Sequence, residues 1–179
     1  MYFGSDFGKI ELIGEETIYC EAGTSLGALC NFALEKELTG LEFAYGIPGT
    51  VGGAVYMNAG AYGGEMKDYI RTVVAIKLED QSMYEIEAKD CDFGYRHSLF
   101  EDGGYVILAA VFDLPEGDKD AIAEQMRTLN EKRRNSQPLD LPSCGSAFKR
   151  PVGGYAAALT TIISGRTVRI AANAPIYTA

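Results

Sequence analysis

The sequence lacks any apolar run of the length that a membrane-spanning helix requires, about 20 residues. Residues 1–16 also lack both the basic region and the apolar stretch of an export signal. We therefore expect a cytoplasmic protein without membrane association.

Metal ligands and paired cysteines are also scarce. The chain has one histidine, His97, and four cysteines that are far apart, with no C-x-x-C pair: Cys20, Cys30, Cys91 and Cys144. Zinc sites and disulfide frameworks need closely spaced ligands or an oxidising compartment. We expect neither a metal site nor disulfides.

Positive charge is scarce as well, with 16 basic residues against 25 acidic ones and a net charge of −9. Nucleic-acid binding needs a basic surface, so it is not expected. Two short basic runs, Lys132–Arg134 and Lys149–Arg150, could each be a solvated face or part of a site for an anionic small molecule.

The order of elements favours an α+β fold. Residues 10–22 predict two short strands around a turn at Gly14, and a helix capped by Thr24 or Ser25 should end at Gly40. Further strands are expected at 69–78, 83–87 and 104–112, and a helix at 119–134. Strands outnumber helices and do not alternate regularly with them. The linker bracketed by prolines after that helix predicts two domains, 1–136 and 137–179.

The segment 44–64 contains seven glycines. No two glycines stand two apart and no Gly-Lys-Ser/Thr occurs, which excludes the dinucleotide fingerprint and the P-loop. Four apolar residues suggest a wall for a flat ring system, and Asn58 suggests its polar edge. The apolar residues are Ile47, Val51, Val55 and Met57. A tight, well-packed turn between helix and strand is the alternative.

A serine nucleophile is disfavoured, because no Gly-x-Ser-x-Gly elbow exists and the one histidine adjoins Arg96. Ser146 lies between Pro142 and Pro151 and follows Gly145. A serine in that setting can donate a proton without being a nucleophile. Alternatively, its hydroxyl binds its own backbone in a turn.

Four blocks occur in an order that resembles the UDP-N-acetylenolpyruvoylglucosamine reductase (UDP-N-acetylmuramate dehydrogenase) family, in its shorter type II form: 46–65, 91–100, 134–138 and 142–151. The resemblance implies the second lobe of a vanillyl-alcohol-oxidase/PCMH-type FAD-binding domain, followed by part of a substrate-binding domain. Its members use FAD and NADPH to reduce an enolpyruvyl ether on a UDP-sugar, which yields UDP-N-acetylmuramate for peptidoglycan.

The resemblance also implies roles for individual residues. Arg96 matches the arginine that binds the substrate carboxylate, and Ser146 matches the serine that donates a proton. Tyr95, Lys149 and Arg150 would help to bind the UDP-sugar. The segment that would bind FAD comprises Gly46, Ile47, Pro48, Gly49, Thr50, Gly52, Gly53, Asn58, Ala59 and Gly60.

Two family features are not recognised in this sequence: an earlier lobe that grips the FAD pyrophosphate, and a later segment that supplies a catalytic glutamate. The match fades after Thr160. We therefore expect little bound FAD and weak or no turnover. The alternative is a non-catalytic binding module that self-associates through the apolar surface left by the missing lobe. A different flavin oxidase of the same fold is disfavoured, because Arg96 and Ser146 fall in reductase motifs.

Overall fold

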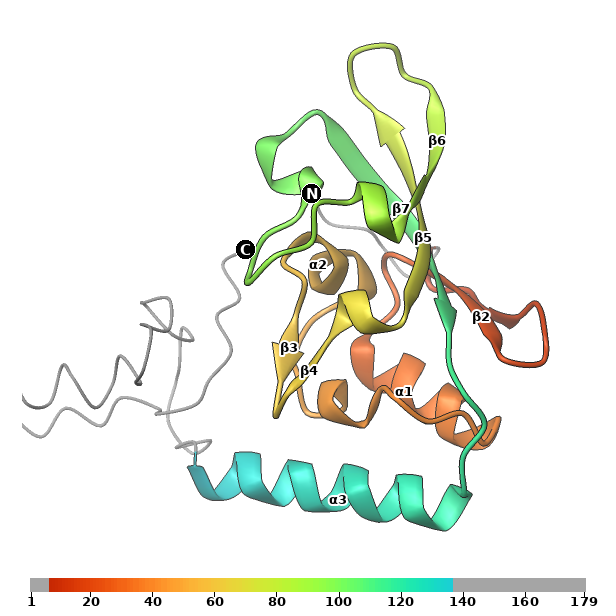
Figure 1. Cartoon of the computed structure of the whole chain (residues 1–179), viewed down its shortest axis with the longest axis vertical. Helices are drawn as coiled ribbons and strands as arrows, with labels where there is room; N and C mark the ends of the chain where they lie inside the picture. The colour runs from red at the N-terminus through yellow and green to blue at the C-terminus, as the bar shows by residue number, and fades with distance from the viewer. Residues whose placement is uncertain (1–6, 137–179) are drawn as a thin grey trace, which may run out of the picture.

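A computed structural model of the chain describes residues 7–136 (Figure 1). Its main feature is a five-stranded antiparallel sheet of order β1-β2-β7-β5-β6. In that order the strands are Ile10–Leu12, Thr17–Glu21, Tyr105–Asp113, Ile70–Lys77 and Met83–Glu87. All of the predicted strands are confirmed. With the helices described below, they give the expected α+β class.

Burial follows position in the sheet. The central strand β7 is buried along most of its length, which accounts for its nearly continuous apolar sequence. The edge strand β6 is mostly exposed and carries Glu85 and Glu87. Charged side chains on an edge strand oppose pairing with another chain.

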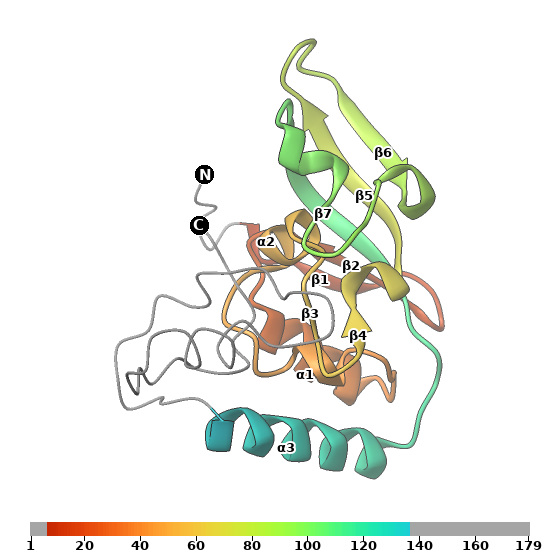
Figure 2. The same ribbon diagram turned by 60° about the vertical axis from the view of Figure 1, so that its left-hand side comes forward.

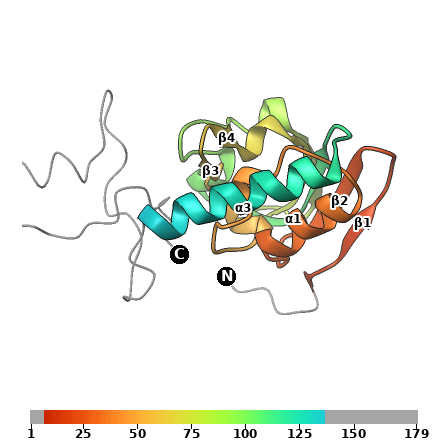
Figure 3. The same ribbon diagram turned by 90° about the horizontal axis from the view of Figure 1, so that it is seen from below.

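Three α-helices complete the described part: α1 (Leu26–Glu35), α2 (Val51–Tyr56) and α3 (Lys119–Ser136). Helix α2 packs on β2 and β7, whereas α3 lies farther from the sheet and packs on α1 and the 3₁₀ turn η2 (Glu42–Ala44) (Figures 2 and 3). Apolar side chains from α1, α2, α3 and the sheet form one hydrophobic core. Further 3₁₀ turns are η3 (Met66–Asp68), η4 (Ala88–Asp90) and η5 (Leu99–Asp102).

Helix α1 begins as predicted and ends earlier than predicted. The Ser25 hydroxyl accepts a hydrogen bond of 3.2 Å from the backbone of Ala28, which makes Ser25 the N-cap. The helix ends at Glu35, and Glu37 has a left-handed backbone with φ of 59°. The Leu38 N–H then donates to the Ala33 carbonyl over 2.9 Å, a Schellman arrangement. The prediction that Gly40 ends this helix is therefore wrong.

The glycine-rich segment contains more than a turn. It forms α2 and then a small hairpin of β3 (Gly60–Ala61) and β4 (Gly64–Glu65). Within residues 7–136, no helix is long and apolar enough to cross a membrane, and no cluster of three or more His, Cys, Asp or Glu residues is placed to hold a metal. The proposed boundary after residue 136 stays a prediction, because 137–179 lie outside the described residues.

Candidate functional site

The glycine-rich segment is fixed to the chain that leads into α1. The Leu26 N–H donates to the Gly49 carbonyl over 3.0 Å, and the Val51 N–H donates to the Thr24 carbonyl over 2.8 Å. These two bonds place the turn before α2 beside the start of α1. The turn before α2 is thus held by backbone hydrogen bonds.

The glycines of this segment serve two different purposes. At four of them a Cβ would lie 2.6–2.9 Å from atoms of neighbouring residues, a separation too short for real contacts. Glycine is needed at these positions because the chain packs closely there. They are Gly46, Gly52, Gly60 and Gly64.

Gly49 and Gly53 differ, because they border open space. Within the described part of the chain, a Cβ on Gly49 would meet nothing within 4 Å, and one on Gly53 would meet only the Thr50 hydroxyl, at 3.9 Å. Gly49 also has φ of 148°, which favours glycine, but Gly53 lies in α2, where alanine would be more stable. Internal packing therefore does not account for glycine at position 53.

We call the exposed residues Pro48, Gly49, Thr50 and Gly53 the open strip. Thr50 is the N-cap of α2, yet its side chain makes no capping hydrogen bond, so the helix does not use its hydroxyl. The strip presents backbone, one hydroxyl and almost no side-chain bulk. It fits a flat cofactor such as FAD, which needs close approach to the backbone.

The apolar residues of the segment do not line this strip. All four of them, Ile47, Val51, Val55 and Met57, are buried, the first three in the hydrophobic core. The expected wall of exposed apolar side chains is therefore not what the structure shows. Among the residues expected to bind FAD, Ala59 and Gly60 are also buried, and Gly46 and Gly52 are half-buried.

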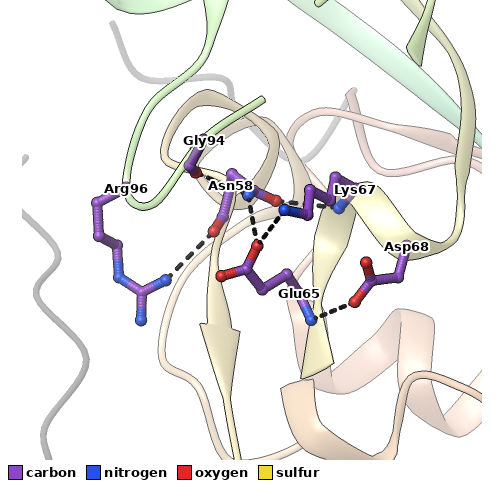
Figure 4. Close-up of polar contacts among 6 residues, drawn as sticks. All are labelled: Asn58, Glu65, Lys67, Asp68, Gly94 and Arg96. Atoms are coloured by element: carbon purple, nitrogen blue, oxygen red, sulfur yellow. Dashed lines mark hydrogen bonds and ion pairs between the residues drawn. The ribbon is translucent and has the colours of Figure 1, made fainter. Parts of the chain in front are cut away.

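Arg96 lies against the end of the same segment. Its side chain is buried, and its Nη2 donates to the Gly60 carbonyl over 2.6 Å. Its Nη1 donates to the Asn58 carbonyl over 3.3 Å (Figure 4). Its backbone is left-handed, with φ of 53°. The structure thus joins the predicted carboxylate-binding arginine to the predicted FAD-binding segment.

Asn58 connects three parts of the chain, and its side chain is 0% exposed. Its Nδ2 donates to Glu65 Oε2 over 3.0 Å and to the Gly94 carbonyl over 2.8 Å, and its Oδ1 accepts from the Lys67 backbone over 3.0 Å (Figure 4). These bonds use both amide hydrogens. The side chain therefore holds the Arg96 loop rather than offering a polar edge to a ligand.

Glu65 is fixed in turn by its neighbours. Its Oε2 lies 3.0 Å from Lys67 Nζ, and its backbone N–H donates to Asp68 Oδ2 over 3.0 Å (Figure 4). Glu65 and Asp68 form a capping box at η3. The carboxylate that accepts from Asn58 is thus held in one orientation.

The loop that carries Arg96 has two further anchors. The Ser98 hydroxyl, which is buried, donates to the Tyr56 carbonyl over 2.6 Å. The His97 ring lies 2.8 Å from a Glu101 oxygen and 3.2 Å from an Asp92 oxygen. Hydrogen bonds to Glu101, and then to Asp92, raise the pKa of His97 above its usual 6.5. The imidazole ring thus links Asp92 and Glu101.

Of the remaining predicted site residues, Tyr95 lies among the described residues and the other three do not. Tyr95 is exposed, and its ring centroid lies 5.1 Å from Arg96 Cζ. Ser146, Lys149 and Arg150 lie outside residues 7–136, so their roles stay predictions.

Sequence reasoning missed the support for Arg96. The sequence indicates no role for Glu65, Lys67 or Ser98, although each holds the loop or the segment that it contacts. Their partners are distant in sequence, and no short motif marks them. Only the fold brings them together.

Comparison with known proteins identifies the family. Residues 5–81 match a family model described as FAD binding domain. The UDP-N-acetylenolpyruvoylglucosamine reductase of Limosilactobacillus reuteri subsp. reuteri (strain JCM 1112) is 50% identical over 151 residues, 84% of this chain and 50% of that protein. The enzyme of the same name from Streptococcus pneumoniae (strain CGSP14) is 48% identical over 143 residues, 80% of this chain and 47% of that protein.

A solved structure agrees with these sequence matches. The crystal structure of UDP-N-acetylenolpyruvylglucosamine reductase (MurB) from Thermus caldophilus superposes with a TM-score of 0.79 and 28% identity, over 99% of this chain and 66% of that chain. The chain spans about half the length of the curated relatives that it matches. It belongs to the UDP-N-acetylenolpyruvoylglucosamine reductase family and carries that family's FAD-binding fold.

Proposed function

We propose that this chain supplies the FAD-binding segment and the carboxylate-binding arginine of a UDP-N-acetylenolpyruvoylglucosamine reductase. The proposed reaction uses NADPH to reduce the enolpyruvyl ether of the UDP-sugar to UDP-N-acetylmuramate, a peptidoglycan precursor, in the cytoplasm. The supporting observation is the direct contact of the Arg96 guanidinium with the carbonyls of Asn58 and Gly60. It joins the arginine to the C-terminal end of residues 46–60, the segment that would bind FAD.

The open strip would hold FAD. Pro48, Gly49 and Gly53 offer a surface free of bulky side chains, and Thr50 offers a hydroxyl. FAD, when bound, accepts hydride from a reduced nicotinamide and passes it to an acceptor carbon. The protein's part is to hold the flat ring and to limit the access of water.

Arg96 would bind the substrate carboxylate. A guanidinium has five N–H donors in a planar fork, and in this structure Nη1 and Nη2 each donate to a carbonyl. The other donors can engage a carboxylate. Hydride addition to an enolpyruvyl group builds negative charge toward that carboxylate, and a fixed, desolvated cation stabilises the charge without reorganising.

Ser146 would donate the proton that completes the reduction. Its hydroxyl would act as a general acid toward the carbon beside the carboxylate. Tyr95, Lys149 and Arg150 would contact the UDP-sugar. Weak turnover by this chain and self-association also stay predictions.

The test is NADPH oxidation that depends on UDP-N-acetylglucosamine enolpyruvate, measured with added FAD. Arg96→Lys keeps the charge but loses the planar fork, so we expect kcat/KM to fall about 100-fold. Arg71→Lys is the matched control, because Arg71 is exposed and pairs with Asp113; its kcat/KM should stay within about twofold of wild type. Equal kcat/KM of Arg96→Lys and wild-type protein would contradict the role proposed for Arg96. Wild-type protein that binds FAD without any substrate-dependent oxidation would favour the binding module.

A further inference from the structure

Helix α3 carries a buried cation, Arg133. It is 4% exposed, whereas its neighbours Lys132 and Arg134 are exposed. Charged side chains are rarely buried without specific contacts. The basic run is therefore not simply a solvated face, and the contacts of Arg133 explain why.

Arg133 contacts the glycine-rich segment near its start. A Cβ on Gly46 would lie 2.7 Å from Arg133 Nε and 3.0 Å from Arg133 Cδ. The Asn130 Oδ1 of the same helix would lie 3.2 Å away. Glycine at position 46 thus makes room for the Arg133 side chain. Helix α3 also packs on η2, which ends two residues before Gly46.

Arg133 also contacts the far end of the segment. Its Cζ lies 5.5 Å from the centroid of the Tyr62 ring, in the turn between β3 and β4. A guanidinium at this distance from an aromatic ring is attracted to it, and Tyr62 is 44% exposed while Arg133 is buried. One side chain therefore touches residues that precede and follow the open strip.

The span between those two contacts contains most of the proposed cofactor site. The open strip lies just after Gly46, and Gly60, whose carbonyl binds Arg96, lies just before Tyr62. The strip itself is held to Thr24 and Leu26 through its backbone. Arg133 adds a contact that fixes the two ends relative to each other.

We propose that Arg133 is a positioning residue that holds segment 46–62 in its FAD-binding arrangement. This inference rests on the proposed function, because it assigns Arg133 to the same FAD site. A bound cofactor needs both the strip and the Gly60 end in place. Loss of Arg133 therefore weakens FAD binding in protein that is still folded.

The test compares FAD dissociation constants of full-length variants by titration of flavin fluorescence, with urea unfolding of the apo proteins. Arg133→Met keeps most of the apolar stem and removes the cation, and we expect its dissociation constant to rise at least about tenfold. Arg133→Lys keeps a cation over Tyr62 and should recover most of that loss. Arg127→Met, at an exposed position of the same helix, should stay within about twofold of wild type.

The Tyr62 side of the contact gives a second measurement. Tyr62→Leu should weaken FAD binding severalfold, whereas Tyr62→Phe keeps the ring and should not. In the Arg133→Met background, Tyr62→Leu should add little, because the contact is already lost. If Arg133→Met does not fold, the Tyr62 pair decides alone.

The outcomes separate this inference from the proposed function. Folded Arg133→Met protein that binds FAD as tightly as wild type overturns the inference and leaves the FAD site standing. Equal FAD affinities of Tyr62→Leu and Tyr62→Phe protein overturn it in the same way. Wild-type protein that does not bind FAD overturns the proposed function itself.

Discussion

Arg96 Nη2 donates a hydrogen bond of 2.6 Å to the carbonyl oxygen of Gly60, 36 residues earlier in the chain. This contact places a buried cation at the end of the segment that carries the open strip. A shift of either partner would move the proposed carboxylate site relative to the proposed FAD site. The residues that hold the Arg96 loop are therefore as important to the proposed function as Arg96 itself.

Asn58→Asp should strongly destabilise the protein. The new carboxylate cannot donate to Glu65 or to the Gly94 carbonyl, and it would face another negative charge while buried. We expect the free energy of unfolding to fall by about 3 kcal/mol, measured by urea denaturation. Asn31→Asp, at an exposed position of α1, should change it by less than about 0.5 kcal/mol. Equal effects of the two substitutions would contradict the role given to Asn58.

His97 should make the Arg96 loop more stable at acidic than at alkaline pH. Glu101 and Asp92 raise the pKa of His97 in the folded state above its usual 6.5. The hydrogen bonds of the protonated imidazole therefore contribute their full stabilisation of the folded protein below pH 6.5. This contribution is lost as the pH rises through the folded-state pKa of His97. Because His97 is the only histidine, one imidazole signal in an NMR titration reports this pKa directly.

His97→Gln should flatten the part of the pH–stability curve that this histidine causes, and the control Glu85→Gln, on the exposed strand β6, should not. An imidazole that titrates at or below 6.5 in the folded protein would show that the hydrogen bonds of His97 to Glu101 and Asp92 do not form.

Three cysteines should resist alkylation until the protein unfolds. Burial raises the pKa of Cys20, Cys30 and Cys91 to about 12 each, so little thiolate is present near neutral pH. In a Cys144→Ser background, iodoacetamide labelling followed by mass spectrometry should proceed at least about 100-fold faster in urea than in buffer. Rapid labelling of the native protein would contradict the packing of these side chains.

Local patterns predict most of the elements. Alternation and turn residues locate the strands, and the Ser25 cap locates the start of α1, because these depend on neighbours in sequence. The end of α1 differs from the prediction because Glu37, rather than Gly40, adopts the left-handed backbone that follows the helix. The apolar residues of the glycine-rich segment are expected around a ligand, but the core buries them.

The site is predictable only in part. Arg96 and the glycine-rich segment can be named from their motifs, yet the bonds that join them depend on chain folding. The sequence assigns Asn58 to the cofactor, whereas its side chain binds Glu65 and Gly94. Nothing in the run of charged residues around Arg133 predicts that its side chain is buried.

The central claim is that FAD lies on the open strip, and Gly53 tests it most directly. Alanine or leucine at this position should stabilise α2 by up to about 1 kcal/mol, since both favour a helix over glycine. Among the described residues, a Cβ there meets only the Thr50 hydroxyl, at 3.9 Å. Both side chains would occupy the space where a flat cofactor approaches the backbone.

The measurement is a titration of FAD into wild-type, Gly53→Ala and Gly53→Leu protein, with Ala121→Leu as an exposed helical control. We predict that the Gly53 variants are at least as stable as wild type, that Gly53→Leu binds FAD at least about tenfold more weakly, and that the control binds normally. FAD binding by Gly53→Leu with wild-type affinity would contradict the claim that FAD lies on the open strip.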